Sequence, residues 1–119
     1  MTEFTVSTDS RLSVVSVTDR VASSLPADAS GTATVHVDHT TAAVTVNEAE
    51  PQLLGDFETA LSGLVSDDGW EHDTLDGNAD AHVRAMLVGP SVTVPVRGGQ
   101  PDLGTWQSVL LVECDGPRT

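Results

Sequence analysis

The sequence predicts a single α+β domain over residues 1–119, in which a mainly antiparallel, sandwich-like sheet carries two or three helices. Its 119 residues, 39% of them apolar, suffice for one compact core and not for two. Apolar and polar residues alternate over several short stretches, which is typical of strands. These stretches come in runs and do not alternate regularly with helices, which favours an antiparallel arrangement over a parallel one.

The first elements are predicted to be a hairpin and a short helix. Residues 3–8 and 11–17 have the composition of strands, and the turn formers Asp9 and Ser10 separate them. A helix over residues 19–25 follows, with Thr18 as its predicted cap and Pro26 as its stop.

Residues 31–48 contain the clearest strand pattern of the chain. Successive side chains of a strand point to opposite faces, so the alternation assigns residues to two sides. One predicted face carries Ala33, Val35, Val37 and His39, and the other carries Thr34, His36 and Asp38.

Two longer helices and a final pair of strands complete the prediction. Pro51 suits the first turn of a helix that continues to Val65. Its apolar residues have helical spacing: Leu53, Leu54, Phe57, Leu61, Leu64 and Val65. After a loop over residues 66–77, Asn78 can cap a helix that runs to Val88 and ends at Gly89 and Pro90. Residues 91–96 and 105–114 are predicted strands, and Pro95 indicates an edge or a bulge.

The charge balance argues against nucleic acid as a partner. The chain has 18 acidic residues, five arginines and no lysine, which gives a net charge of −13. Binding phosphates requires clustered cations, and these arginines are scattered. Such an acidic surface is typical of halophilic archaeal proteins, in which molar salt screens the repulsion. With neither a transmembrane run nor a signal peptide, we expect no membrane association and a cytoplasmic location. The single Cys114 cannot form an internal disulfide.

Three of the four histidines are candidates for one metal site. His39 shares the apolar strand face, and His36 points to the polar side as an expected bystander. On the predicted helix, His82 shares the apolar, inward stripe with Ala79, Val83, Met86 and Leu87, and His72 lies in the loop that leads to this helix. Three imidazoles leave one open position on a catalytic ion, and nitrogen ligands favour zinc over magnesium.

Less specific interpretations of the same residues stay open. An inward histidine is more often a hydrogen-bonded core residue than a metal ligand. Asp80 can stabilise the helix start and pair with Arg84 four residues later. Asp73, Asp76 and Asp80 are candidate acceptors that orient the imidazoles, whereas in the less specific interpretation Asp73 and Asp76 belong to a solvated loop.

Several blocks of the chain together resemble one known family. The stretches "DHTTAAVTVNEAEP", "EHDTLDGNADAHVRAMLVGPSVTVPV", "GTWQ" and "ECDGPR" occur in order between residues 35 and 118. In this they are similar to the secondary thiamine-phosphate synthase enzyme family. The resemblance implies a sandwich-like homotrimer with sites near the subunit interfaces. It also implies a weak condensation of hydroxymethylpyrimidine diphosphate with hydroxyethylthiazole phosphate, and thus a small phosphorylated substrate.

The resemblance assigns roles to individual residues. The histidines of "HTTA", "EHD" and "DAH" are His39, His72 and His82, which become the expected ligands of a divalent metal, zinc by preference. Asn47 and Glu48 become candidate catalytic residues. The implied substrate-binding set is Thr40, Ser91, Thr105, Gln107 and Arg118. The chain departs from the family pattern at Cys114, where an aromatic residue is common, and at its end at Thr119.

These observations leave three hypotheses for function. In the first, an enzyme uses the metal to polarise a phosphate oxygen or to activate water, with Glu48 as the base. In the second, the protein is a non-catalytic metal-stabilised trimer or a small-molecule-binding protein. The third is a plain structural domain whose histidines are simply buried.

Overall fold

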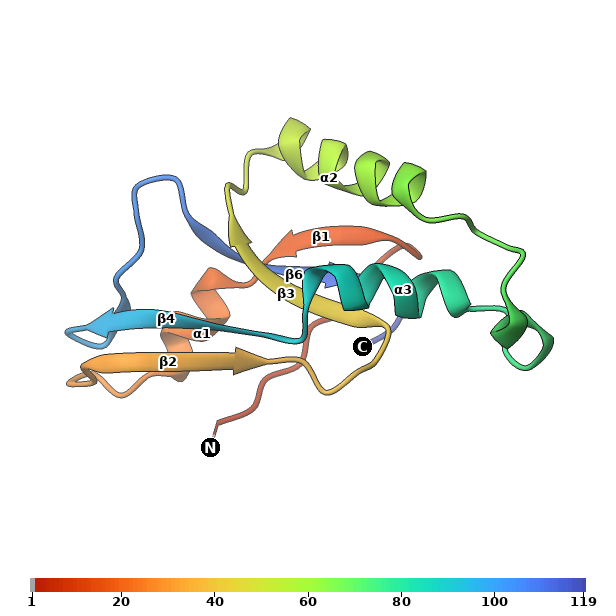
Figure 1. Ribbon diagram of the computed structural model, residues 1–119. Coiled ribbons are helices and arrows are strands. Elements are labelled where there is room, and N and C mark those ends of the chain that lie inside the picture. Colours follow the sequence, from red (N-terminus) through yellow and green to blue (C-terminus); the bar gives the residue numbers. More distant parts are fainter. Residues whose placement is uncertain (1) are drawn as a thin grey trace.

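The computed structural model describes residues 2–119 and confirms the α+β class (Figure 1). Three α-helices and a short 3₁₀ helix accompany two antiparallel sheets of three strands each. The elements in chain order are β1 (Ser13–Ser16), α1 (Thr18–Ser24), β2 (Gly31–His36), β3 (Ala42–Asn47), α2 (Pro51–Leu64), η1 (Glu71–Thr74), α3 (Ala79–Val88), β4 (Ser91–Arg97), β5 (Gln100–Pro101) and β6 (Ser108–Glu113).

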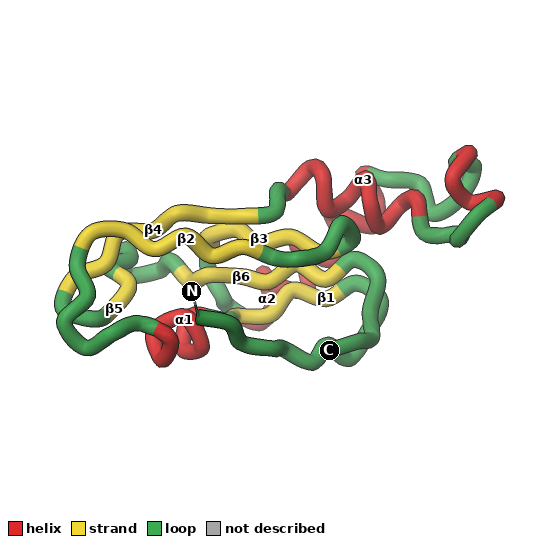
Figure 2. Tube along the Cα trace, turned by 90° about the horizontal axis from the view of Figure 1, so that it is seen from below, coloured by secondary structure: helices red, strands yellow, loops and turns green. Residues whose placement is uncertain are grey.

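The two sheets pack against each other, and helices cover the outer face of one of them. The strand orders are β1-β6-β3 and β2-β4-β5, and every neighbouring pair is antiparallel (Figure 2). Between the sheets lies a core centred on Val44, Val94 and Val109. On the other face of β1-β6-β3, Leu110 and Val112 pack against residues of α2 and α3. Alternate residues of β3 and β6 therefore serve two cores, as strand geometry requires.

The predicted opening hairpin is wrong. Residues 2–9 are not a strand, although Phe4 and Val6 pack against the core between the sheets. Among the strands of residues 2–119, β1 pairs with β6 alone, with Val14 opposite Val112. Local turn formers such as Asp9 and Ser10 therefore did not decide the pairing, because β6 offers a longer apolar partner.

The long strand predicted over residues 31–48 is in fact two strands in different sheets. β2 pairs with β4, and β3 pairs with β6. Between them the segment 37–41 crosses from one sheet to the other. Its backbone is held by hydrogen bonds from Val37 N to Pro90 O (2.9 Å) and from Cys114 N to Thr41 O (3.1 Å). The crossing takes His39 off the strand face on which the alternation placed it.

The three helices lie where the sequence predicts them, but neither Thr18 nor Asn78 caps its helix with a side-chain hydrogen bond. Other helix ends have local causes. Glu50 caps α2, because its carboxylate accepts hydrogen bonds from the backbone N–H groups of Gln52 and Leu53. Pro51 occupies the first turn. Helix α3 ends at Gly89, whose φ of +105° lies in the region that favours glycine.

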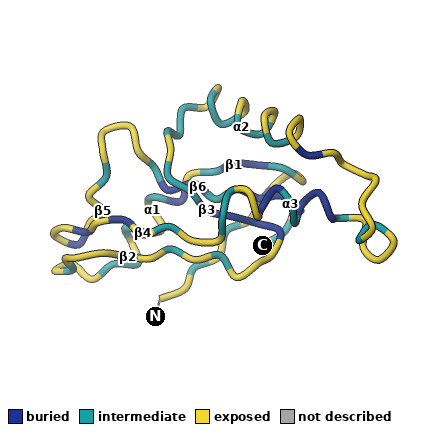
Figure 3. The backbone as a smooth tube through the Cα atoms, viewed as in Figure 1, coloured by how far each residue is buried: buried dark blue, intermediate teal, exposed yellow. Residues whose placement is uncertain are grey.

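The inward face of α3 was predicted incorrectly. The buried residues of this helix are Ala79, Asp80, Ala81, Arg84 and Ala85. Met86 and Leu87, both placed on the inward stripe by sequence, are 73% and 59% exposed. His82 is half-buried between these two faces. The segment before α3, including η1, projects from the body and is mostly exposed (Figures 1 and 3).

Within residues 2–119, no helix combines the length and the apolar character needed to cross a bilayer.

Candidate functional site

The structure brings His72 and His82 together. Their ring centroids are 5.1 Å apart and the rings meet edge to face, at an interplanar angle of 87°. They face a cavity of about 320 Å³ between η1 and α3. Its lining residues are Trp70, Glu71, His72, Ala79, His82 and Val83. Of these, only His72 and His82 were expected at a site, although Trp70 and Glu71 directly precede His72 in the sequence.

A single carboxylate fixes the segment that carries His72. One oxygen of Asp73 accepts a hydrogen bond from Trp70 N (3.2 Å), and the other accepts one from Ala79 N (3.3 Å). The indole N–H of Trp70 donates to the carbonyl of Ser66 (2.8 Å). Asp73 therefore connects the start of η1 to the start of α3, and it is a structural residue rather than a solvated loop carboxylate.

The Nε2 atom of His72 is the least satisfied polar atom of this cavity. It is buried and has no hydrogen-bond partner among the described residues. Oδ2 of Asp76 lies 3.5 Å away, which is within ion-pair range, but the two atoms do not meet hydrogen-bond geometry. A bound molecule that hydrogen-bonds to this nitrogen would recover the free energy lost by burying it, about 1–3 kcal/mol.

An ion network is centred on two buried residues of α3, Asp80 and Arg84. The predicted pair of Asp80 and Arg84 is present, and Asp80 is fully buried. Arg11 approaches the same carboxylate with an Nη2–Oδ1 distance of 2.7 Å. This hydrogen bond and the negative charge of Asp80 raise the pKa of Arg11. Arg84 also lies 2.8 Å from Asp67, and its hydrogen bond and charge lower the pKa of that carboxyl.

The predicted three-histidine metal centre is wrong for this protomer. His39 is exposed within the segment 37–41, and it does not line the cavity of His72 and His82. Among residues 2–119, no group of three or more His, Cys, Asp or Glu side chains is arranged to hold a metal ion. Two imidazoles alone are fewer than the three or four protein ligands that hold zinc. His36 is exposed, as expected, 3.6 Å from the carboxylate of Asp38.

The two candidate catalytic residues lie at the end of β3. The side-chain oxygen of Asn47 accepts a hydrogen bond from the backbone N–H of Glu48 (2.8 Å). Asn47 lines a second cavity, between α2, α3 and the sheet, which does not include either histidine. The structure therefore places Asn47 apart from the cavity of His72 and His82.

The expected substrate-binding residues are dispersed. Thr105 and Gln107 belong to the segment between β5 and β6, which lies at the end of the molecule opposite η1 (Figure 1). Within this segment Gln107 Oε1 accepts a hydrogen bond from Gly104 N. Ser91 begins β4 opposite His36, and Thr40 is exposed beside His39.

Arg118, the last member of that set, is paired with a carboxylate of its own chain. Its Nε and Nη2 atoms lie 2.9 Å and 2.7 Å from the two oxygens of Glu113. Such a bidentate pair leaves little of the guanidinium for a phosphate. The roles of these five residues in binding stay predictions.

Known proteins match most of this chain. A family model described as "UPF0047 protein YjbQ-like" matches residues 2–119. A curated UPF0047 protein of Archaeoglobus fulgidus is 44% identical, over 98% of this chain and 93% of its own. YugU of Bacillus subtilis, also a UPF0047 protein, is 39% identical over 76% of this chain and 69% of its own.

Solved structures of similar sequence share the fold. A hypothetical protein of Aeropyrum pernix is 47% identical with a TM-score of 0.91, covering 97% of this chain and 88% of that protein. A YbjQ-like protein of unknown function from Sulfolobus solfataricus is 37% identical with a TM-score of 0.86, covering 96% and 85%.

These matches overturn the thiamine-phosphate interpretation. The family model and the curated relatives carry the description UPF0047, and nothing in their names indicates a synthase, a transferase or thiamine. The resemblance to the secondary thiamine-phosphate synthase family was therefore wrong as an identification, and so was the condensation reaction inferred from it.

Proposed function

The chain belongs to the UPF0047 family of YjbQ-like proteins, and we propose that it binds a small polar molecule in the cavity between η1 and α3. The observation that carries this proposal is the buried, unpartnered Nε2 of His72 beside the ring of His82. A neutral imidazole has one donor and one acceptor nitrogen, so two rings can hold two polar atoms of one ligand. The same arrangement lets an imidazole exchange a proton with that ligand.

The lining of the cavity favours a neutral or cationic ligand. None of its six lining residues is arginine, and Glu71 contributes a negative charge. The net charge of −13 adds to this bias. The small phosphorylated substrate expected from the sequence stays a prediction, and inorganic phosphate tests it directly.

A homotrimer is part of the proposal. A globular monomer of 12.4 kDa exposes about 6100 Å², whereas this protomer exposes 7120 Å². Large apolar side chains contribute to the excess, since Leu64, Leu75 and Met86 are each more than 70% exposed. Self-association would bury such residues. Sedimentation equilibrium measures the mass, and three copies are the expected result.

Two further expectations belong to this proposal. A cytoplasmic location is compatible with the buried free thiol of Cys114. The divalent metal, zinc by preference, stays a prediction that elemental analysis of the dialysed protein checks, although two imidazoles of one protomer are too few to hold it.

The test is a titration of the imidazole signals of His72 and His82 by NMR. The probes are methylguanidinium, acetamide and inorganic phosphate, in one high-salt buffer. We expect saturable shifts with a cationic or neutral probe, their loss in His72→Ala, and their retention in His36→Ala, which removes a histidine outside the cavity. Equal binding by wild type and His72→Ala, or no binding of any probe, would refute the proposal.

A further inference from the structure

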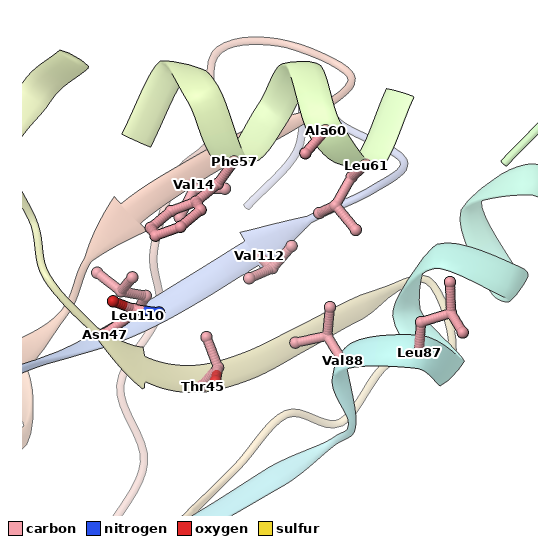
Figure 4. A pocket seen from close by; sticks show the side chains of 10 residues that line it. All are labelled: Val14, Thr45, Asn47, Phe57, Ala60, Leu61, Leu87, Val88, Leu110 and Val112. Atoms are coloured by element: carbon pink, nitrogen blue, oxygen red, sulfur yellow. The ribbon is translucent and has the colours of Figure 1, made fainter. Parts of the chain in front are cut away.

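A second cavity lies between helices α2 and α3 and the face of the sheet β1-β6-β3. It has a volume of about 320 Å³ and shares no lining residue with the cavity of His72 and His82. Figure 4 shows its lining side chains: Val14, Thr45, Asn47, Phe57, Ala60, Leu61, Leu87, Val88, Leu110 and Val112. We call it the α2–α3 groove. None of these ten residues is charged, and eight of them are apolar.

The groove exists because α2 does not pack tightly against the sheet. No residue of α2 is buried, although Phe57 and Leu61 point from it toward the sheet (Figure 4). Val88 of α3 stands on the opposite side, and Leu110 and Val112 of β6 form the floor. Apolar walls around a volume of this size are typical of sites for small ligands.

Asn47 supplies one oriented hydrogen-bond donor at the end of the groove. Because its Oδ1 accepts the N–H of Glu48, the orientation of the carboxamide is fixed and its Nδ2 is free to donate. Figure 4 shows this nitrogen on the side that faces the groove. Thr45 is the second polar residue of the lining.

We propose that the α2–α3 groove binds a neutral, mostly apolar small molecule whose carbonyl oxygen accepts a hydrogen bond from Asn47. Contact with the apolar walls removes apolar surface of the ligand from water, which favours binding by about 25 cal/mol per Å² buried. A carboxylate or phosphate head group does not fit, because no cation lines the groove and the chain is strongly acidic. This site is independent of the proposed function of the histidine cavity.

Acetophenone and ethylbenzene form a matched pair of probes, because they differ by a carbonyl oxygen in place of two hydrogens. Each is titrated into the intact protein, and the backbone amide shifts of Phe57, Leu61 and Val88 are followed. We expect saturable shifts with both, and about fivefold tighter binding of acetophenone from its one hydrogen bond. In Asn47→Ala the two probes should bind equally.

A second pair of variants separates the groove from general effects on the helix. Ala60→Phe fills the groove and should abolish binding of both probes, whereas Thr59→Phe places the same side chain on an exposed position outside the lining and should preserve it. Equal affinities in the wild type overturn the assignment of Asn47. If the amide signals of the groove residues shift with neither probe and change only on dilution of the protein, a second copy of the chain covers the groove. This result overturns the proposal.

Discussion

The guanidinium of Arg84 in α3 reaches the backbone of Val65, with Nη2 lying 2.7 Å from the carbonyl oxygen. Arg84 Nε also donates to Leu61 O at 3.0 Å. The last carbonyls of a helix have no partner within it and carry partial negative charge, so this cation completes the end of α2. The segment that carries His72 begins directly after Val65. Arg84 thus fixes the start of that segment and joins α3 to the end of α2.

Replacing Arg84 should therefore be among the most damaging changes in the chain. Arg84→Met leaves Asp80, which is fully buried, without its main partner. Breaking a buried pair in this way costs about 3–5 kcal/mol. Urea denaturation of the variant measures the loss. The control is Arg97→Met. Arg97 is exposed, and its guanidinium comes no nearer than 3.8 Å to the carboxylate of Asp102. Its loss should lower the free energy of unfolding by less than about 0.5 kcal/mol. Similar losses in the two variants would contradict the role of the network.

The stability of the protein should fall with acid partly through Asp67. Arg84 holds the pKa of this carboxyl below its usual 3.8 in the folded state. A lowered folded pKa means that the ionised group stabilises the fold above the unfolded pKa, and that this contribution disappears as the pH falls through the folded pKa. Melting temperatures of the wild type and Asp67→Asn, measured from pH 7 downward, should differ most at neutral pH and converge in acid. Parallel curves would show that the ion pair does not contribute.

Cys114 should be unreactive in the folded protein. Burial, together with the neighbouring charge of Glu113, raises the pKa of its thiol to about 11. A disulfide reagent at pH 7 should label it slowly in buffer and rapidly in urea. Since the folded pKa is raised above 9.0, the thiol stabilises the fold below that pH, and this contribution is lost as the pH rises toward 11. Rapid labelling in buffer would indicate that the chain at the end of β6 unfolds locally and exposes the thiol.

His72 should separate stability from binding. Its Nε2 is buried without a partner, so His72→Phe removes an unsatisfied polar atom and keeps an aromatic ring. We expect the free energy of unfolding to stay within about 1 kcal/mol of the wild type or to rise. Binding of the cavity probes should disappear in the same variant. A large destabilisation would mean that this imidazole has a structural partner, and the proposed site would lose its main support.

The sequence predicted the helices well because their ends depend on local chemistry. Pro51 and Gly89 act within one turn of their own positions. Strand pairing depends on distant residues, so the partner of β1 and the division of residues 31–48 between two sheets were not predictable from alternation. The position of His39 depended on that division, so the predicted cluster of three histidines within one protomer failed with it.

The inward face of α3 was missed for a different reason. Hydrophobic periodicity assigns charged residues to the solvent, whereas Asp80 and Arg84 are buried as a pair. The spacing of four residues did reveal the pair itself. It could not reveal Arg11, Asp67 or the carbonyls of α2, which are distant in sequence and make burial of the pair possible.

The two oxygens of Asp73 accept hydrogen bonds from the N–H groups of Trp70 and Ala79, so one carboxylate holds both η1 and the first turn of α3. Local unfolding of η1 therefore also breaks the hydrogen bond to the first turn of α3. Both amides should then exchange with deuterium in a common opening event, and Asp73→Ala should release them together.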